Sequence, residues 1–256
     1  MLYCVKNMHS DTHITEKLAK ENQELREKLA IAEQWIGREL SEIRFRKMKE
    51  EAKKQTKHGL MESEEDIHER CKKYFGENYI LLSPENRELL IESEINFSHL
   101  IRQKDIDGLI VTNAYQKILE NLFEEHITKK FREEHKKSRL HPQKNDLLEK
   151  TIYKVLKNDF HLSLGKIYLI LEKGLQEETG DLIELFRLSA EQQPLYNALS
   201  HGNFWEYFTD IIETGAFGEK RHAGKITLKD VRFLREKITG NFEKEGFLKI
   251  ILDYIK

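Results

Sequence analysis

The side chains best suited to chemistry lie in a glycine-containing segment between two expected helices. Residues 215–225 hold Arg221 and His222 next to each other, together with three glycines. A guanidinium binds phosphate groups, and an imidazole gains or loses a proton near neutral pH. Loops often carry functional side chains, because a rigid scaffold can present them there. Arg221 and His222 are therefore the weak catalytic candidates of this chain. Side chains of adjacent residues point in different directions, so the two need not act together on one group.

A histidine and a cysteine three residues apart form a second candidate pair. His68 and Cys71 would lie on neighbouring faces of one helix. A nearby imidazole can favour the thiolate, which is the reactive form of cysteine. Nucleophilic catalysis also needs a third group that orients the base, and none is evident beside this pair. We therefore interpret the pair as a coincidence on the surface of a charged helix.

Sequence motifs for metals and nucleotides are missing. The 11 histidines include no HExxH pair, and Cys4 and Cys71 form no CxxC. His126 and His135 are nine residues apart, which places them on nearly opposite faces of a helix. The glycines of residues 215–225 lack the spacing of a phosphate-binding loop. The sequence therefore predicts no metal site and no cofactor.

The elements that position these residues are expected to be helices. The 256 residues include only 3 prolines and 13 glycines, whereas strand-rich proteins need turn residues every ~8–12 positions. Ser83 before Pro84, and Thr227 three residues before Asp230, are typical helix starts. Hydrophobic periodicity predicts helices over about 64–75, 84–103, 109–136, 146–158, 163–173, 181–190, 194–213, 228–238 and 242–255.

The N-terminal part of the chain has the pattern of a coiled coil. Its apolar positions recur at alternating spacings of three and four residues, with a final spacing of seven. They are Leu18, Asn22, Leu25, Leu29, Ala32, Ile36 and Ile43. A lone asparagine such as Asn22 commonly fixes the register and favours two strands. The predicted partner is a second copy of this chain or another protein. The alternative, in which the helix packs within its own chain, would usually show a wider apolar stripe.

A basic stretch follows this seam and is a candidate nucleic-acid contact. Its members are Arg44, Arg46, Lys47, Lys53 and Lys54. Glu42, Glu50 and Glu51 lie among them and lower the local potential, and aromatic residues for base stacking are sparse. Across the chain, 43 basic residues balance 45 acidic ones. The ordinary interpretation is a solvated helix face.

These patterns predict an all-α protein in which a long N-terminal coiled-coil helix precedes a helical bundle. The expected parts are residues 1–58, a helical domain over 59–140 and a C-terminal bundle over 141–256. The N-terminus lacks the order of a signal peptide, and no apolar run approaches the ~18–20 residues of a membrane span. We therefore expect a cytoplasmic protein without a membrane partner.

The C-terminal two thirds resemble the HEPN family of prokaryotic all-helical domains. Residues 222–227 read His-Ala-Gly-Lys-Ile-Thr, a Leu- and Arg-containing helix follows over 231–238, and residues 113–120 resemble an earlier helix of that family. The resemblance implies a helical bundle in a prokaryotic, often antiviral, defence system. Catalytic members of the family cut RNA with an Arg and a His separated by four to six residues. In this chain those positions before His222 are Gly215, Ala216 and Phe217, so the resemblance implies a copy without the catalytic pair.

Three functions follow from these patterns. The first is a non-enzymatic interaction or oligomerisation component, because the coiled-coil seam is the most specific feature of the sequence. The second is a HEPN-type ribonuclease with a degenerate site at Arg221 and His222. The third is a nucleic-acid-binding adaptor that uses the basic stretch.

Overall fold

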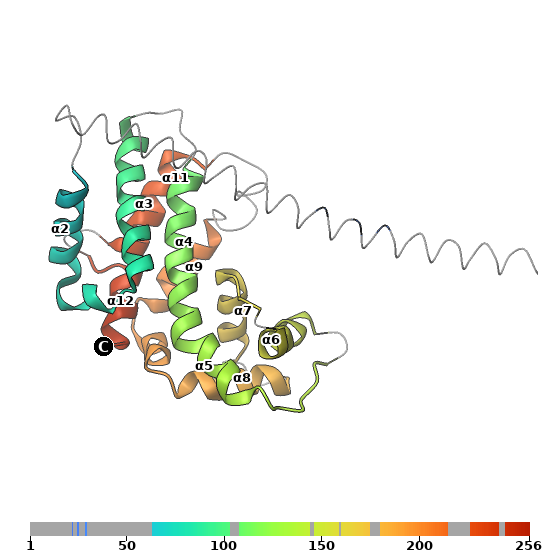
Figure 1. The fold of residues 1–256 in the computed structure, drawn as a ribbon. Coiled ribbons are helices and arrows are strands. Elements are labelled where there is room, and N and C mark those ends of the chain that lie inside the picture. The colour runs from blue at the N-terminus through green and yellow to red at the C-terminus, as the bar shows by residue number, and fades with distance from the viewer. Residues whose placement is uncertain are drawn as a thin grey trace, which may run out of the picture. The chain divides into compact units, whose positions relative to one another are not determined.

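The computed structural model describes residues 63–102, 108–143, 146–158, 160–174, 180–214, 226–240 and 244–256, together with Asn22, Leu25 and Leu29 (Figure 1). The chain divides into two compact units, Met1–Lys54 and Gln55–Lys256. The predicted boundary near residue 140 falls inside the second unit. The paragraphs below describe that unit by itself.

The second unit is all-helical in its described residues, which contain no strand. This confirms the predicted fold class at the level of secondary structure. The α-helices are α2 (Glu64–Phe75), α3 (Pro84–Arg102), α4 (Leu109–Phe123), α5 (Lys129–His135), α6 (Leu147–Asn158), α7 (Leu164–Gly174), α8 (Asp181–Glu191), α9 (Phe204–Glu213), α11 (Leu228–Thr239) and α12 (Phe247–Tyr254). None of the described helices is long and apolar enough to cross a bilayer.

Local signals place the helix starts where the sequence predicts them. Ser63 and Thr227 each accept a hydrogen bond from the backbone N–H three residues on, and Asp66 and Asp230 return the contact. These reciprocal capping boxes satisfy backbone donors that a helix start would otherwise leave unpaired. Ser83 Oγ likewise accepts from the backbone N–H of Asn86 at 3.2 Å and caps α3. Caps therefore explain why α2, α3 and α11 begin at the predicted residues.

The antiparallel pair α3 and α4 forms the centre of the bundle, with α2 against α3 and α11 against both (Figure 1). A second group of helices, α6, α7 and α8, packs beyond the end of α4. Phenylalanine rings in mutual contact join the helices. Phe123 of α4 and Phe247 of α12 both contact the ring of Phe208 in α9, with centroids 5.5 and 5.2 Å away. All three rings are buried, so they form the apolar centre of the unit.

The long helix predicted from Leu109 is interrupted by a π-helical turn. Residues Glu124–Thr128 form this turn between α4 and α5, so the chain stays helical from Leu109 to His135. A π turn inserts one residue into the helical repeat and rotates the face that follows. Ile127 and Phe131 thereby remain buried after the turn. Periodicity predicts the length of this helical segment but not its π turn.

Two predicted helices are wrong in their extent. The helix predicted over 194–213 is a 3-10 helix, Pro194–Ser200, followed by a break and then α9. His201 is extended there, and Gly202 and Asn203 form the turn that precedes α9. The helix predicted over 242–255 begins only at Phe247, because Gly246 has an extended backbone at its N-cap. Gly246 also packs against the backbone of residues 238–240, a contact that a side chain would prevent.

Candidate functional site

The coiled-coil seam is described at three of its positions. Asn22, Leu25 and Leu29 are helical, and the two leucines are 62 % and 59 % exposed. Their spacings of three and four residues place them on one helix face. The other predicted oligomerisation residues, Leu18, Ile36 and Ile43, lie outside the described residues, as does the rest of the seam.

The remaining predicted site residues also lie outside the described part of the chain. They are the catalytic candidates Arg221 and His222, and the basic residues Arg44, Arg46, Lys47, Lys53 and Lys54. The degenerate ribonuclease site and the basic nucleic-acid contact therefore stay predictions.

The cysteine at position 71 has a different environment from the predicted one. Cys71 is buried, with 6 % of its surface exposed, so its interpretation as a surface residue is wrong. The ring of His68 lies instead against that of Tyr79, with centroids 5.5 Å apart. Among the described residues, no group of three or more His, Cys, Asp or Glu side chains could hold a metal ion.

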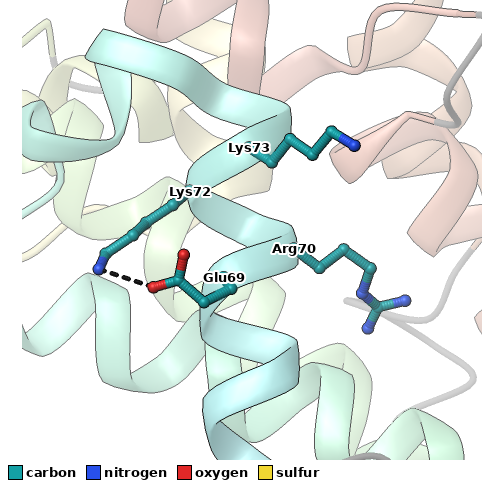
Figure 2. Close-up of a pocket in the computed structure, with 4 residues that line it drawn as sticks. All are labelled: Glu69, Arg70, Lys72 and Lys73. Carbon is teal, nitrogen blue, oxygen red and sulfur yellow. Dashed lines mark hydrogen bonds and ion pairs between the residues drawn. The ribbon is translucent and has the colours of Figure 1, made fainter.

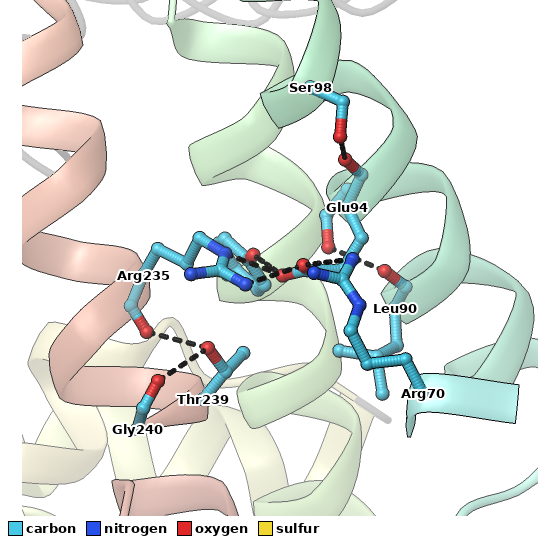
Figure 3. A network of polar contacts seen from close by, with 9 residues as sticks. Arg70, Leu90, Glu94, Ser98, Arg235, Thr239 and Gly240 are labelled. Carbon is cyan, nitrogen blue, oxygen red and sulfur yellow. Dashed lines mark hydrogen bonds and ion pairs between the residues drawn. The ribbon is translucent and has the colours of Figure 1, made fainter. Parts of the chain in front are cut away.

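A buried carboxylate, Glu94 on α3, is the centre of the most elaborate polar cluster that the structure describes (Figure 3). Its Oε1 accepts hydrogen bonds from the Tyr115 hydroxyl at 2.6 Å and from Arg235 Nε at 2.9 Å. Its Oε2 accepts from Arg235 Nη2 at 2.7 Å and from Arg70 Nη2 at 3.1 Å. Four donor atoms thus surround one carboxylate that is only 3 % exposed. We call Arg70, Glu94, Tyr115 and Arg235 the Glu94 cluster.

The cluster joins four helices, because each member comes from a different one. Arg70 belongs to α2, Glu94 to α3, Tyr115 to α4 and Arg235 to α11. Figure 3 shows Arg70 and Arg235 reaching Glu94 from separate helices. Tyr115 is fully buried, whereas the side chains of Arg70 and Arg235 are 29 % and 25 % exposed. The cluster therefore extends from the core toward solvent.

The electrostatics of the cluster keep Arg235 charged and Tyr115 neutral. Burial opposes the charged form of Arg235, but the hydrogen bonds and charge of Glu94 outweigh burial and raise its pKa above the ordinary arginine value. Burial, followed by the charge of Glu94, raises the pKa of Tyr115 well above 10.0. Tyr115 therefore remains a hydrogen-bond donor throughout the physiological range.

A cavity of about 100 Å³ lies beside this cluster, between α2, α3 and α11. Its polar lining comes from Arg70, Glu94, Arg235, Thr239 and Tyr74. Cys71, Phe75, Leu90 and Gly240 complete the wall. Among the described lining residues, Arg70 and Arg235 are the cations and Glu94 is the carboxylate that both contact.

The α2 surface next to this cavity carries a larger, open hollow of about 680 Å³ (Figure 2). Among the described residues, Glu69, Arg70, Lys72 and Lys73 line it. Lys72 and Glu69 form an ion pair at 3.0 Å, and Figure 2 shows Arg70 and Lys73 extending from the opposite side of the helix. Arg70 is the residue that lines both the hollow and the inner cavity among the described residues.

This arrangement is suited to binding and poorly suited to proton transfer. Each oxygen of Glu94 already accepts two hydrogen bonds, so the carboxylate has little capacity left to act as a general base. An arginine, in contrast, carries five N–H donors, and Arg235 uses Nε and one Nη2 hydrogen for Glu94. Its Nη1 remains for another acceptor. The site can therefore present guanidinium donors to an anion.

The sequence holds a signal for this cluster that does not belong to any catalytic or metal-binding motif. Glu94 lies on the apolar face of α3 between Leu90 and Phe97, at spacings of four and three. Arg235 lies in the same way between Val231 and Ile238 on α11. A charge on the buried face of a helix needs a partner of opposite charge in the core. These two positions could have been identified as partners by that criterion.

Comparisons of this chain with protein-family models, with curated proteins and with solved structures find no match.

Proposed function

We propose that this chain is a non-enzymatic interaction protein that pairs with a second copy of itself through its N-terminal helix. The observation that carries the proposal is the exposure of Leu25 and Leu29 on one helix face, 62 % and 59 % respectively. Two large apolar side chains four residues apart form a stripe that a partner helix covers in a coiled coil.

The energy available from such pairing is substantial. Burying a leucine side chain that is otherwise exposed contributes about 1.5–3 kcal/mol. A homodimer buries each seam leucine in both copies, so each position contributes twice. Asn22, three residues before Leu25, contributes specificity, because a buried asparagine pairs best with its own counterpart in a two-stranded register. A parallel homodimer therefore satisfies both the leucines and the asparagine.

The resemblance of residues 85–256 to HEPN domains gives this proposal a context. In that context the helical bundle is the recognition surface of a prokaryotic defence or stress component, and the N-terminal helix brings two bundles together. The context rests on the resemblance, and the pairing rests on the leucines.

The molar mass in solution tests the pairing, measured by light scattering after size exclusion. We expect the wild type to have twice the mass of one chain and the double variant Leu25→Asp, Leu29→Asp to have the mass of one chain. Leu147→Asp is the matched control, since Leu147 is 76 % exposed at the start of α6 and lies outside the seam. We expect this control to remain dimeric. A wild type that is monomeric at micromolar concentration would contradict the proposal.

A further inference from the structure

We propose that His161 accepts a phosphoryl group on its exposed ring nitrogen from a small phosphoryl donor of the acyl phosphate or phosphoramidate class. The residue lies in the segment between α6 and α7 and contacts Glu124, the first residue of the π turn. Both residues belong to the second unit. The inference is therefore independent of the proposed pairing through the N-terminal helix.

His161 contacts a carboxylate in a way that leaves its outer nitrogen available. Its Nδ1 lies 3.4 Å from Glu124 Oε2, and its side chain is 75 % exposed. His135 and His201 also contact carboxylates, but through Nε2, and each of them is only 29 % exposed. The ring of His161 thus faces the carboxylate with Nδ1 and leaves Nε2 to the solvent.

Glu124 favours the form of the imidazole that can act as a nucleophile. Its Oε2 is buried, and no described group donates a hydrogen bond to it. A buried acceptor without a donor is unfavourable, so the proton of a neutral His161 is favoured on Nδ1, the nitrogen beside this oxygen. Nε2 then keeps its lone pair, and this nitrogen lies on the far edge of the ring.

The carboxylate itself is held in place by its neighbours. Glu124 Oε1 accepts a hydrogen bond from Arg132 Nη2 at 2.7 Å, and Arg132 Nε donates to the backbone oxygen of Val155 at 3.2 Å. The side chains of Glu124 and Arg132 are only 17 % and 15 % exposed. One turn earlier, on α4, Glu120 Oε1 accepts from the backbone N–H of Leu164 at 3.1 Å. Glu120 and Glu124 therefore hold the segment that carries the imidazole, which limits the positions that its ring can take.

Phosphoryl transfer to this nitrogen is balanced without a further reagent. The lone pair of Nε2 forms a bond to phosphorus, the bond from phosphorus to the leaving group of the donor breaks, and the leaving group departs with that electron pair. The proton stays on Nδ1, so the ring becomes an imidazolium. Glu124 lies 3.4 Å from that nitrogen and stabilises the new positive charge, as a buried carboxylate does beside a catalytic histidine.

The charges around His161 admit an anionic donor. Arg132 compensates the negative charge of Glu124 through an ion pair of 2.7 Å. Lys166 lies over the ring of Phe160, the residue before His161, with its Nζ 5.1 Å from the ring centroid. A positive charge is therefore present close to the segment that carries the imidazole, and it favours the approach of a phosphoryl group.

General-base catalysis by the same histidine fits the described structure less well. A general base must lie beside a bound substrate, within hydrogen-bond reach of the proton that it removes. Neither the hollow on α2 nor the cavity beside the Glu94 cluster has His161 among its described lining residues. A phosphoryl acceptor needs only that a small donor reaches its nitrogen, which the exposure of His161 allows.

Labelling of the full chain with phosphoramidate at neutral pH tests the proposal. Phosphorus NMR and peptide mass spectrometry under alkaline conditions, which preserve the acid-labile N–P bond, follow the products. His141, an exposed histidine whose ring lies against that of Tyr153, is the internal reference. We expect His161 to be labelled about tenfold faster than His141 or more, because its ring is oriented and its product is stabilised by a carboxylate.

Two variants separate the acceptor from the residue that positions it. His161→Gln should fold normally, because the side chain is exposed, and should lose the fast labelling. In Glu124→Gln, the ratio of labelling at His161 to labelling at His141 should fall about tenfold. Both histidines are in the same chain, so a change in stability alone would leave this ratio unaltered.

Glu133→Gln, at an exposed position of α5, is the matched control and should keep the ratio of the wild type. Labelling of His161 and His141 at equal rates, or of neither, would overturn the proposal. Fast labelling that persists in His161→Gln, or an unchanged ratio in Glu124→Gln, would overturn it as well.

Discussion

Arg235 of α11 and Glu94 of α3, which are 141 residues apart in the sequence, form a bidentate ion pair. The Nε–Oε1 distance is 2.9 Å and the Nη2–Oε2 distance is 2.7 Å. The paired oxygens also accept from Tyr115 and Arg70, so one carboxylate connects α2, α3, α4 and α11. This relationship makes Glu94 the polar link between these four helices, so its loss should weaken their packing against one another.

Replacing the carboxylate should destabilise the protein strongly. Glu94→Gln removes the charge but keeps the size of the side chain, and it takes from Arg235 the carboxylate to which it is bonded through two nitrogens. Breaking one partner of a buried pair costs about 3–5 kcal/mol. Urea unfolding followed by circular dichroism measures the change. Glu88→Gln, at an exposed position of the same helix, is the control and should change the free energy of unfolding by less than ~0.5 kcal/mol.

Removing both partners should cost less than the sum of the two single changes. Glu94→Leu alone removes the carboxylate that pairs with Arg235, whereas Glu94→Leu with Arg235→Met replaces the pair by apolar side chains of similar size. Coupling between contacting residues is about 0.5–3 kcal/mol, and here it should favour the double variant. A double-mutant cycle of unfolding free energies gives this coupling. Additive effects would show that Arg235 and Glu94 do not stabilise the fold as a pair.

Tyr115 should make the protein sensitive to alkali. Its pKa is raised in the folded state, first by burial and then by Glu94, whereas the unfolded value is near 10.0. The folded state therefore holds the phenolic proton more tightly. Stability from this group is complete below about pH 10 and is lost as pH rises from there toward the folded pKa.

A phenylalanine at position 115 tests this sensitivity. Tyr115→Phe removes the titrating hydroxyl and its 2.6 Å hydrogen bond to Glu94, so it should be less stable at neutral pH by about 1–3 kcal/mol. Its stability should then fall less steeply than that of the wild type above about pH 10. Unfolding free energies at neutral and alkaline pH provide the measurement. Parallel pH profiles for the two proteins would refute the role of Tyr115.

Protonation of His126 should lower the stability of the protein in mild acid. Burial, followed by the charge of Lys130, lowers the pKa of His126 below its ordinary value of 6.5. The unfolded state therefore binds a proton at higher pH than the folded state does. The stabilisation is complete above about pH 6.5 and is lost as pH falls through the folded pKa.

An asparagine at position 126 should remove this acid-dependent loss. In His126→Asn, the free energy of unfolding should decline less than in the wild type as pH falls below about 6.5. Proton NMR of the histidine rings should also lose one resonance that titrates below that value. An unchanged pH dependence would mean that the surroundings of His126 do not oppose its charged form.

Gly180 should tolerate no side chain, because it packs against the buried Glu149. The carboxylate of Glu149 accepts hydrogen bonds from the backbone N–H groups of Gln143 at 2.6 Å and Leu182 at 3.0 Å, the latter in the first turn of α8. A Cβ on Gly180 would overlap Glu149 Oε1 and displace this cap. We expect Gly180→Ala to lower the free energy of unfolding by about 1–3 kcal/mol.

A glycine in open space gives the comparison. Gly165 lies in α7, and a Cβ there would meet nothing within 4 Å. Gly165→Ala should stabilise the protein by up to about 1 kcal/mol, because alanine favours helix. Thermal unfolding of both variants should therefore shift the midpoint in opposite directions. Equal shifts would mean that the packing of Glu149 against Gly180 does not matter to stability.

The sequence by itself determined the features that depend on neighbouring residues. Helix starts at Ser63, Ser83 and Thr227 follow from side chains that hydrogen-bond within three residues, and this geometry forms locally. The all-helical class follows in the same way from periodicity and from the scarcity of turn residues. Asn22, Leu25 and Leu29 are helical, whereas the coiled coil itself stays a prediction, because the rest of the seam lies outside the described residues.

Only the tertiary structure decided the features that depend on distant partners. The π turn at Glu124–Thr128 and the break at His201–Asn203 adjust helix faces to surrounding packing, which periodicity within one segment does not contain. Glu94 and Arg235 could each be recognised as a charge on an apolar face. Their pairing with Arg70 and Tyr115 depended on how four helices pack, because a buried charge is stabilised by whichever partner the fold brings within hydrogen-bonding distance.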